Sequence, residues 1–230
     1  KSMDPHQLLL GVAALAREAG RAILEVYASS FSVQEKEDRS PLTEADLRSE
    51  KLILAGLKRL APEIPVLSEE AAQAPYSTRR HWPRLWVVDP LDGTREFVQR
   101  NGEFTVNIAL VDRHRPVLGV VHAPVLERTY YAAEGAGAFR SDKEAAGQPI
   151  RVAKRGAGPV RVVGSRSHRG SSLDAFLARV GEHELVEVGS SLKLCLVAEG
   201  QADVYPRLGP TSEWDTAAGQ CVLEQAGATC

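Results

Sequence analysis

Two carboxylates that follow an apolar segment are the residues of this chain best placed to do chemistry. Residues 85–88 are apolar and predict a buried strand, and Asp89 and Asp92 come directly after it. Two acids packed together repel each other unless a cation lies between them, and Mg²⁺ prefers oxygen ligands of this kind. Gly93 and Thr94 then open an expected helix, whose free N–H groups suit an anion. The segment therefore predicts a site for metal and phosphate.

An ordinary turn is the alternative explanation of this segment, because Asp-Pro and Asp-Gly are frequent turn pairs and Asp caps helices well. Other acids in the chain favour the metal site over the turn. Glu69 and Glu70 follow a short expected strand, whereas Asp46 and Asp215 each lie in the first turn of an expected helix. Taken singly, the glutamates suit a solvated surface and the aspartates suit helix capping. Taken together, these acids make a convergent metal site the better hypothesis.

Composition narrows the class of protein. The 230 residues are 43% hydrophobic and 25% charged, which is ordinary for a globular protein of one large domain or two small lobes. The net charge of −2 gives no support to nucleic-acid binding. No apolar stretch approaches the roughly 20 residues that span a bilayer, and three cysteines without metal-ligand spacing fit a reducing cytosol. We therefore expect a cytoplasmic protein without stable membrane insertion.

The elements that must position the acids are expected to form two lobes that share a cleft. Apolar residues recur at helical spacing over 5–28 and 44–60. Strands are expected at 66–67, 85–89, 104–112, 116–122 and 128–133, the last three as an antiparallel meander, with loops at 32–42 and 134–150. Further along, strands at 160–164, 184–188 and 203–206 alternate with helices at 172–180, 190–199 and 213–225. The first half therefore indicates an α+β lobe and the second an α/β lobe.

Three motifs resemble the inositol-monophosphatase-like superfamily of magnesium-dependent, lithium-sensitive phosphatases. They are Glu69-Glu70, Asp89-Pro90-Leu91-Asp92-Gly93-Thr94 and Trp214-Asp215-Thr216-Ala217-Ala218, in the order that the family has. The resemblance runs from about residue 5 to residue 230. It implies a layered αβαβα sandwich of the sugar-phosphatase type. Residues 1–150 would form the antiparallel-rich α+β lobe with the metal site, and residues 151–230 a smaller α/β lobe that contributes Asp215 and nucleotide contacts.

Other segments are similar to one branch of that superfamily, the CysQ-type 3′(2′),5′-bisphosphate nucleotidases of bacterial sulfur metabolism. They are Thr94-Arg95-Glu96-Phe97, 100–110, 165–168, 189–193 and 198–207. The resemblance implies hydrolysis of the 3′-phosphate of adenosine 3′,5′-bisphosphate to AMP and phosphate by a metal-activated water. Glu96, Arg100 and Asn101 distinguish the branch, and the residues themselves give no role for any of them.

The resemblance also implies the metal ligands. For two or three Mg²⁺ ions they are Glu69, Asp89, Asp92, Asp215 and the backbone carbonyl of Leu91. The chemistry agrees, because Pro90 fixes the turn so that Leu91 presents its carbonyl. Two metals about 4 Å apart can clamp the attacking and leaving oxygens of an in-line displacement. Spacing leaves open whether Glu69 or Glu70 binds metal, and the resemblance favours Glu69, which we count among the catalytic residues.

The remaining roles follow from the resemblance and from charge. Thr94 paired with Asp46 should take the proton of the attacking water, although a helix cap is an alternative role for Thr94. The amides of Gly93 and Thr94 should hold the scissile phosphate. The candidates for the second phosphate and the nucleoside are His168, Ser190, Lys193 and Arg207. For Lys193 and Arg207 an ordinary surface charge is the alternative.

Other functions remain open at this point. The metal site suits an inositol monophosphatase, or a broad sugar-phosphate or NADP phosphatase, equally well. A non-catalytic nucleotide or metal sensor is the alternative from another class. We expect a small-molecule nucleotide substrate and a monomer or homodimer. By family analogy the protein could also associate peripherally with the inner membrane.

Overall fold

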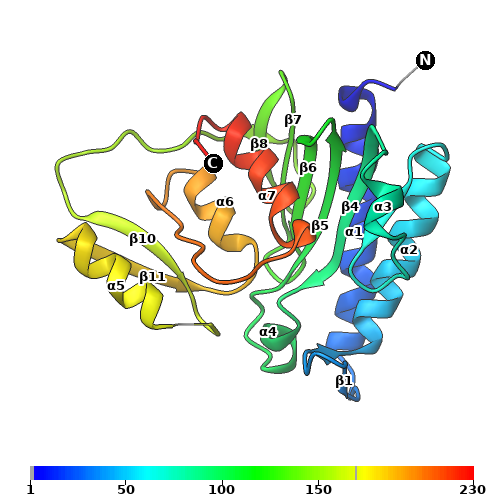
Figure 1. The fold of residues 1–230 in the computed structure, drawn as a ribbon, viewed down its shortest axis with the longest axis horizontal. Helices are drawn as coiled ribbons and strands as arrows, with labels where there is room; N and C mark the ends of the chain where they lie inside the picture. Colours follow the sequence, from blue (N-terminus) through cyan, green and yellow to red (C-terminus); the bar gives the residue numbers. More distant parts are fainter. Residues whose placement is uncertain (1–2, 169) are drawn as a thin grey trace.

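The computed structural model describes residues 3–168 and 170–230, and these form alternating layers of helix and sheet. The layer-forming helices are α1 (Pro5–Tyr27), α2 (Glu44–Leu60), α5 (Ser171–Val180), α6 (Leu192–Ala198) and α7 (Glu213–Gln225). Figure 1 shows α1 and α2 on one face of a large sheet and α6 and α7 on the other. Beyond α6 lie a small sheet, of strands β10 (Val160–Ser165) and β11 (His183–Val188), and then α5. This arrangement confirms the predicted αβαβα sandwich.

The large sheet has seven strands in the order β3-β4-β5-β6-β7-β8-β9. They are β3 (Val66–Ser68), β4 (Arg84–Asp92), β5 (Thr105–Asp112), β6 (Arg115–Ala123), β7 (Arg128–Ala133), β8 (Gly137–Asp142) and β9 (Gln148–Pro149). Only β3 and β4 pair in parallel, and the other neighbours are antiparallel. The meander predicted for 104–133 is therefore confirmed as β5, β6 and β7.

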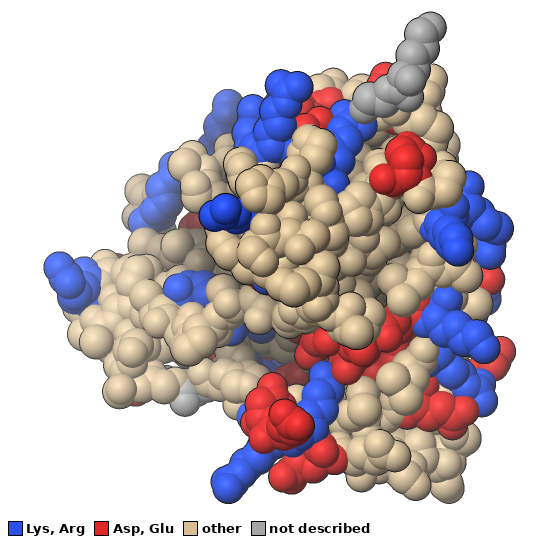
Figure 2. Space-filling model, turned by 45° about the vertical axis from the view of Figure 1, so that its right-hand side comes forward, with Lys and Arg blue, Asp and Glu red and all other residues tan. Residues whose placement is uncertain are grey.

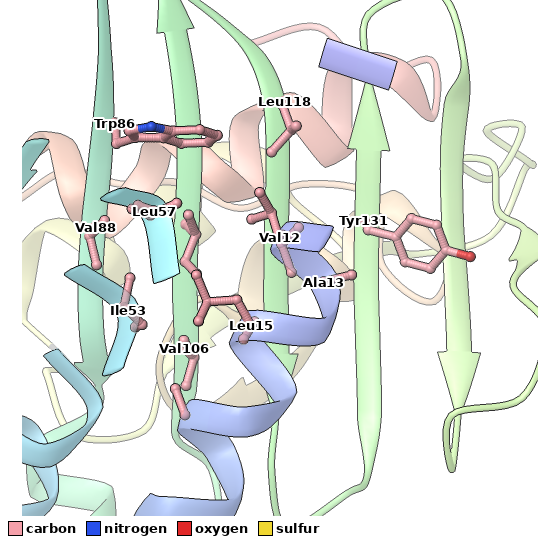
Figure 3. Packing of buried hydrophobic residues seen from close by; sticks show 14 of the residues in the cluster. Val12, Ala13, Leu15, Ile53, Leu57, Trp86, Val88, Val106, Leu118 and Tyr131 are labelled. Carbon is pink, nitrogen blue, oxygen red and sulfur yellow. The ribbon is translucent and has the colours of Figure 1, made fainter. Parts of the chain in front are cut away.

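Helices on both faces of the large sheet explain why β4 is apolar without alternation. Trp86 and Val88 pack into the core under α1 and α2, and Val87 between them packs into the core under α6 and α7. Figure 3 shows the first of these cores, where side chains of α1 and α2 meet those of the strands. A Cβ on Gly56 of α2 would stand 2.3 Å from Leu15 Cδ1, so the glycine permits the close approach of the two helices.

The long helices were predicted well because their ends carry local signals. α1 begins after Asp4, whose side chain accepts a hydrogen bond from the N–H of His6 at 3.0 Å, and Pro5 fills its first turn. α2 and α7 each begin with a capping box, formed by Thr43 with Asp46 and by Ser212 with Asp215. The predicted bounds of these three helices are confirmed to within one residue.

Two segments that we expected to be loops contain strands. Within 32–42, β1 (Gln34–Glu35) and β2 (Pro41–Leu42) form an antiparallel hairpin. Within 134–150, β8 and β9 extend the large sheet. Ala138 packs into the core under α7, and Gly135, with φ 80°, lies in the turn before β8. Both pairs of strands consist largely of polar and small residues. They were not predicted, because neither shows the alternation of apolar and polar residues by which strands are recognised.

Two further expectations needed correction. The strand expected at 203–206 is a single bridge, in which Val204 pairs with Val162 of β10. The stretch between β3 and β4, for which no helix or strand was expected, contains a short helix, α3 (Tyr76–Arg79). Another short helix, α4 (Thr94–Val98), follows β4 as predicted.

The division into lobes near residue 150 stays a prediction. The C-terminal part does build its own parallel sheet from β10 and β11. However, α7 from the same part packs against β5 and β6 of the large sheet. Among the described residues, no helix is both long enough and apolar enough to cross a bilayer.

Candidate active site

A cleft of about 290 Å³ opens where the end of β4 meets the first turns of α4, α6 and α7. Figure 2 shows acidic and basic side chains around a hollow in the lower half of one face. All but one of the residues predicted for the site line this cleft. They are Glu69, Asp89, Leu91, Asp92, Gly93, Thr94, His168, Ser190, Lys193, Arg207 and Asp215. The exception is Asp46, which lies behind the wall of the cleft.

Three carboxylates come together at one end of the cleft. Asp89, Asp92 and Asp215 each offer an oxygen within 4.8 Å of the others. Asp89 and Asp92 share one end of β4, because the strand bulges between them. Asp215 reaches the same point from the first turn of α7, more than a hundred residues further along the chain. The convergence predicted from the sequence is therefore present for these three acids.

The electrostatics of the three carboxylates fit a divalent cation. Burial raises the pKa of Asp89 well above its usual value, and the nearby charges of Glu69 and Asp92 raise it further. Burial also raises the pKa of Asp92 to about 7, although Lys193 opposes the shift. Crowded acids of this kind are stabilised in the charged form only by a cation. Since every donor is an oxygen, the residues present fit a hard ion such as Mg²⁺.

The turn between Asp89 and Asp92 is held by contacts that the sequence did not reveal. The hydroxyl of Ser49 on α2 donates to the carbonyl oxygen of Pro90 at 2.7 Å, and the N–H of Leu91 donates to Asp89 Oδ1 at 3.2 Å. The Leu91 side chain is buried, while its residue lines the cleft. This arrangement agrees with the expected role of the Leu91 carbonyl. No local pattern identifies Ser49, because its contact joins residues far apart in the sequence.

Thr94 and Asp46 form the predicted pair. The Thr94 hydroxyl lies 3.0 Å from Asp46 Oδ1 and 3.3 Å from the Leu91 carbonyl oxygen, so its one hydrogen is shared between these acceptors. Thr94 is the first residue of α4, and Gly93 with φ 88° takes the N-cap position. The capping alternative for Thr94 is therefore wrong. Burial raises the pKa of Asp46, and hydrogen bonds from Thr43 and Thr94 oppose the shift.

Glu69 and Glu70 are joined by a lysine that the sequence analysis did not single out. Lys36 Nζ, from the β1–β2 hairpin, lies 3.1 Å from Glu69 Oε1 and 2.5 Å from Glu70 Oε1. Burial raises the pKa of Glu70 to about 7. Burial alone would lower the pKa of Lys36, but its two acidic partners raise it. Glu69 also lies close enough to Asp89 to raise the pKa of that acid, so it adjoins the three aspartates.

Basic side chains line the same cleft. Lys193 is 5% exposed, with its ammonium 5.7 Å from the centroid of the Tyr205 ring. Arg207 donates to the Tyr205 hydroxyl at 3.3 Å and to the carbonyl oxygen of Pro210 at 2.6 Å. Burial lowers the pKa of His168, whose backbone N–H donates to the Ser165 hydroxyl at 3.1 Å. These residues place positive charge beside the carboxylates.

The segment before α6 is held by two carboxylates. The N–H of Ser191 donates to Asp92 Oδ2 at 2.6 Å, and the N–H of Gly189 donates to Glu103 Oε2 at 2.8 Å. Ser190 between them has a left-handed backbone, with φ 56°. Such a conformation is costly for a non-glycine residue, and here two carboxylate acceptors hold it. The segment thereby fixes where α6 begins and where Lys193 lies.

The fold and the acidic cleft define a class of protein. The model of the inositol monophosphatase family matches residues 4–230, and the chain belongs to this family. Members of the family are metal-dependent, which agrees with the cluster of Asp89, Asp92 and Asp215.

Individual relatives have names that specify an activity. The 3′(2′),5′-bisphosphate nucleotidase CysQ of Salmonella typhimurium is 54% identical over 223 residues, which cover 96% of this chain and 89% of the relative. The protein of the same name from Escherichia coli K12 is 52% identical, over 94% of this chain and 87% of the relative. The crystal structure of CysQ from Bacteroides thetaiotaomicron is similar with a TM-score of 0.82 at 43% identity, over 94% of this chain and 85% of that one.

Proposed function

We propose that this protein is a 3′(2′),5′-bisphosphate nucleotidase that removes the 3′-phosphate of adenosine 3′,5′-bisphosphate, giving AMP and inorganic phosphate. The observation that carries the proposal is that one cleft is lined by both a carboxylate cluster and basic side chains. Three carboxylates meet within 4.8 Å, and Lys193, Arg207 and His168, the basic half, line the same cleft. A substrate with two phosphates suits both halves, one phosphate for each. The names of relatives at 52–54% identity support the same substrate.

Mg²⁺ is the proposed cofactor, with two or three ions in the site. The residues that would hold the ions are Glu69, Asp89, Asp92, Asp215 and the Leu91 carbonyl. Bound Mg²⁺ would supply charge neutralisation for the phosphate and acidify a water molecule. Lys36 contacts Oε1 of Glu69 at 3.1 Å, so Oε2 is the oxygen that Glu69 would offer the ion. We place the reaction in the cytoplasm.

Thr94 and Asp46 are the proposed proton-accepting pair. The buried Asp46 has no place in the cleft, so it acts on the substrate only through the Thr94 hydroxyl at 3.0 Å. Asp46 is held in one orientation, because its other oxygen accepts from the N–H and the hydroxyl of Thr43, both at 2.8 Å. The scissile phosphate would lie against the amides of Gly93 and Thr94, where α4 begins.

The basic half would bind the second phosphate and orient the nucleoside. Lys193 and Arg207 would supply positive charge, and His168 and Ser190 would supply hydrogen bonds. Burial lowers the pKa of Lys193, while the charge of Asp92 opposes this effect. Substrates with one phosphate would leave this half unpaired, which provides a basis for selectivity.

A panel of phosphate-release assays tests the proposal. Adenosine 3′,5′-bisphosphate in Mg²⁺ should give a higher kcat/KM than an inositol monophosphate or NADP. Asp92→Asn should abolish turnover, whereas Asp142→Asn, at an exposed residue that does not line the cleft, should retain it. Preference for an inositol phosphate or NADP would assign the chain to another branch of the family. Tight nucleotide binding in calorimetry without release from any substrate would indicate a sensor, and would overturn the proposal.

A further inference from the structure

Glu96 is a carboxylate of the cleft wall that neither the metal cluster nor the Thr94–Asp46 pair uses. It is the third residue of α4, it lines the cleft, and it is only 3% exposed. A carboxylate removed from water is costly unless hydrogen bonds satisfy its oxygens. The position of Glu96 beside an expected phosphate increases that cost, because two anions repel each other.

The side-chain hydrogen bond of Glu96 uses one of its two oxygens, and the other lies beside Gly93 of the cleft. Oε1 accepts a hydrogen bond from the hydroxyl of Ser167. Oε2 lies 3.2 Å from the place where a Cβ on Gly93 would stand. A Cβ on Gly189 would approach Glu96 Cγ to 2.5 Å, so the glycine provides the space that the carboxylate fills. Within residues 3–168 and 170–230, no donor to Oε2 is recorded.

We propose that Glu96 accepts a hydrogen bond from the hydroxyl that neighbours the scissile phosphate ester, and that it selects substrates carrying this hydroxyl. The inference rests on the proposed function. A phosphate at the start of α4 would place the adjoining sugar carbon beside Gly93, next to Glu96 Oε2. In adenosine 3′,5′-bisphosphate the neighbouring hydroxyl is the ribose 2′-OH, and in the 2′,5′ isomer it is the 3′-OH. The same acceptor therefore serves both isomers.

The charges around Glu96 favour a neutral donor over a further cation. Lys193 and His168 are the groups of the basic half that respond to the charge of Glu96. Both already lie where the second phosphate would bind. A hydroxyl satisfies the carboxylate without adding charge, and it separates the carboxylate from the phosphate. A hydrogen bond to a charged acceptor is among the stronger ones in proteins.

A pair of substrates that differ in one hydroxyl tests the inference. The wild-type protein should hydrolyse adenosine 3′,5′-bisphosphate with a kcat/KM at least about tenfold higher than that of 2′-deoxyadenosine 3′,5′-bisphosphate. Glu96→Leu keeps the volume and removes the acceptor, so the ratio should fall to within about threefold. Glu96→Gln keeps a weaker acceptor, and its ratio should lie between the two. Equal rates for the two substrates in the wild type, or an unchanged ratio in Glu96→Leu, would overturn the inference.

Glu103→Gln is the matched control for a merely structural effect. Glu103 also bonds the segment before α6, through the N–H of Gly189, but it does not line the cleft. Its loss should lower kcat/KM for both substrates together and leave their ratio unchanged. If Glu96→Leu does not fold, the kcat/KM ratio of the two substrates in the wild type and in Glu96→Gln still tests the inference. Release from neither substrate would refute the proposed function, whereas equal release from both would refute this inference alone.

Discussion

The first turns of α2 and α7 share one local structure but have different surroundings. Both begin with a capping box in which an aspartate at the third helical position accepts from the backbone N–H of the cap, at 2.8 Å from Asp46 to Thr43 and at 2.9 Å from Asp215 to Ser212. Asp46 is fully buried and its second oxygen meets the Thr94 hydroxyl. Asp215 lines the cleft and lies within 4.8 Å of Asp89 and Asp92.

The comparison shows how one capping pattern can supply two kinds of chemistry. In each helix one carboxylate oxygen is used for capping, which fixes the side chain, and the other oxygen is left for the site. The surroundings suit different proposed roles. A neutral hydroxyl suits the proposed proton acceptor Asp46, and two other carboxylates suit the proposed cation ligand Asp215.

The largest effect is expected from Asp215→Asn. The amide keeps an oxygen for the capping bonds but lowers the charge of the cluster, so cation binding should weaken strongly. Metal-ion catalysis contributes several kcal/mol, and kcat/KM should therefore fall by about 10³-fold or more. The thermal stability of the cation-free protein should not fall, because one of three repelling charges is removed. Full activity in this variant would remove Asp215 from the proposed ligands.

Asp46→Asn should have the next largest effect, of about 10²-fold on kcat. The amide oxygen can still accept from Thr43, but the NH2 group that then faces Thr94 is a donor, so the side chain no longer takes a proton from the Thr94 hydroxyl. Cation affinity should remain close to that of the wild type, since Asp46 lies outside the cluster. Calorimetric titration with Mn²⁺ separates the two variants. Equal losses of cation affinity in Asp46→Asn and Asp215→Asn would contradict the difference drawn between the two first turns.

The pH dependence of stability should reveal the crowded acids. Burial raises the folded-state pKa of Asp92 from 3.8 to about 7, so the folded protein binds more protons than the unfolded chain between these values. The free energy of unfolding should therefore fall as pH rises through this window. Without divalent cations, Tm should drop by about 5 °C between about pH 5 and pH 8. Excess Mg²⁺ should remove most of this decline, and Asp92→Asn should reduce it. A Tm that rises over the same range would contradict this picture.

The smallest effects are expected from the caps themselves. Thr43→Ala and Ser212→Ala each remove one side chain of a capping box and should cost about 1 kcal/mol of stability. Thr43→Ala should cost more, because it also removes a hydroxyl donor to the buried Asp46 at 2.8 Å. In α7 the corresponding donor to Asp215 is the Thr211 hydroxyl at 2.9 Å, which Ser212→Ala leaves in place. Urea unfolding of both variants measures the difference, and a larger loss for Ser212→Ala would contradict the account.

The sequence predicted the parts of the fold that carry local signals. α1, α2 and α7 combine apolar residues at helical spacing with caps, and β4 is an uninterrupted apolar run. The β1–β2 hairpin and strands β8 and β9 were missed, because their residues are polar or small and pairing with distant residues gives them their form. Tertiary context outweighs local propensity in such strands.

For the site, the motifs identified which residues gather but not how they are held. Every residue predicted to line the cleft does so, and Asp46 reaches it through Thr94 as expected. Lys36, Ser49 and the burial of Glu96 were not foreseen. Each depends on a contact between segments that are remote in the sequence, so no spacing rule identifies them. The assignment of individual metal ligands stays a prediction.

Crystals grown with Mn²⁺ test the central claim most directly, because anomalous scattering locates the ion without reference to activity. The account predicts anomalous density among the carboxylates of Asp89, Asp92 and Asp215, and none beside Asp46. In crystals of Asp215→Asn that density should weaken or vanish. Wild-type crystals in excess Mn²⁺ without density among these three acids, or with an ion bound by Asp46 instead, would contradict the account.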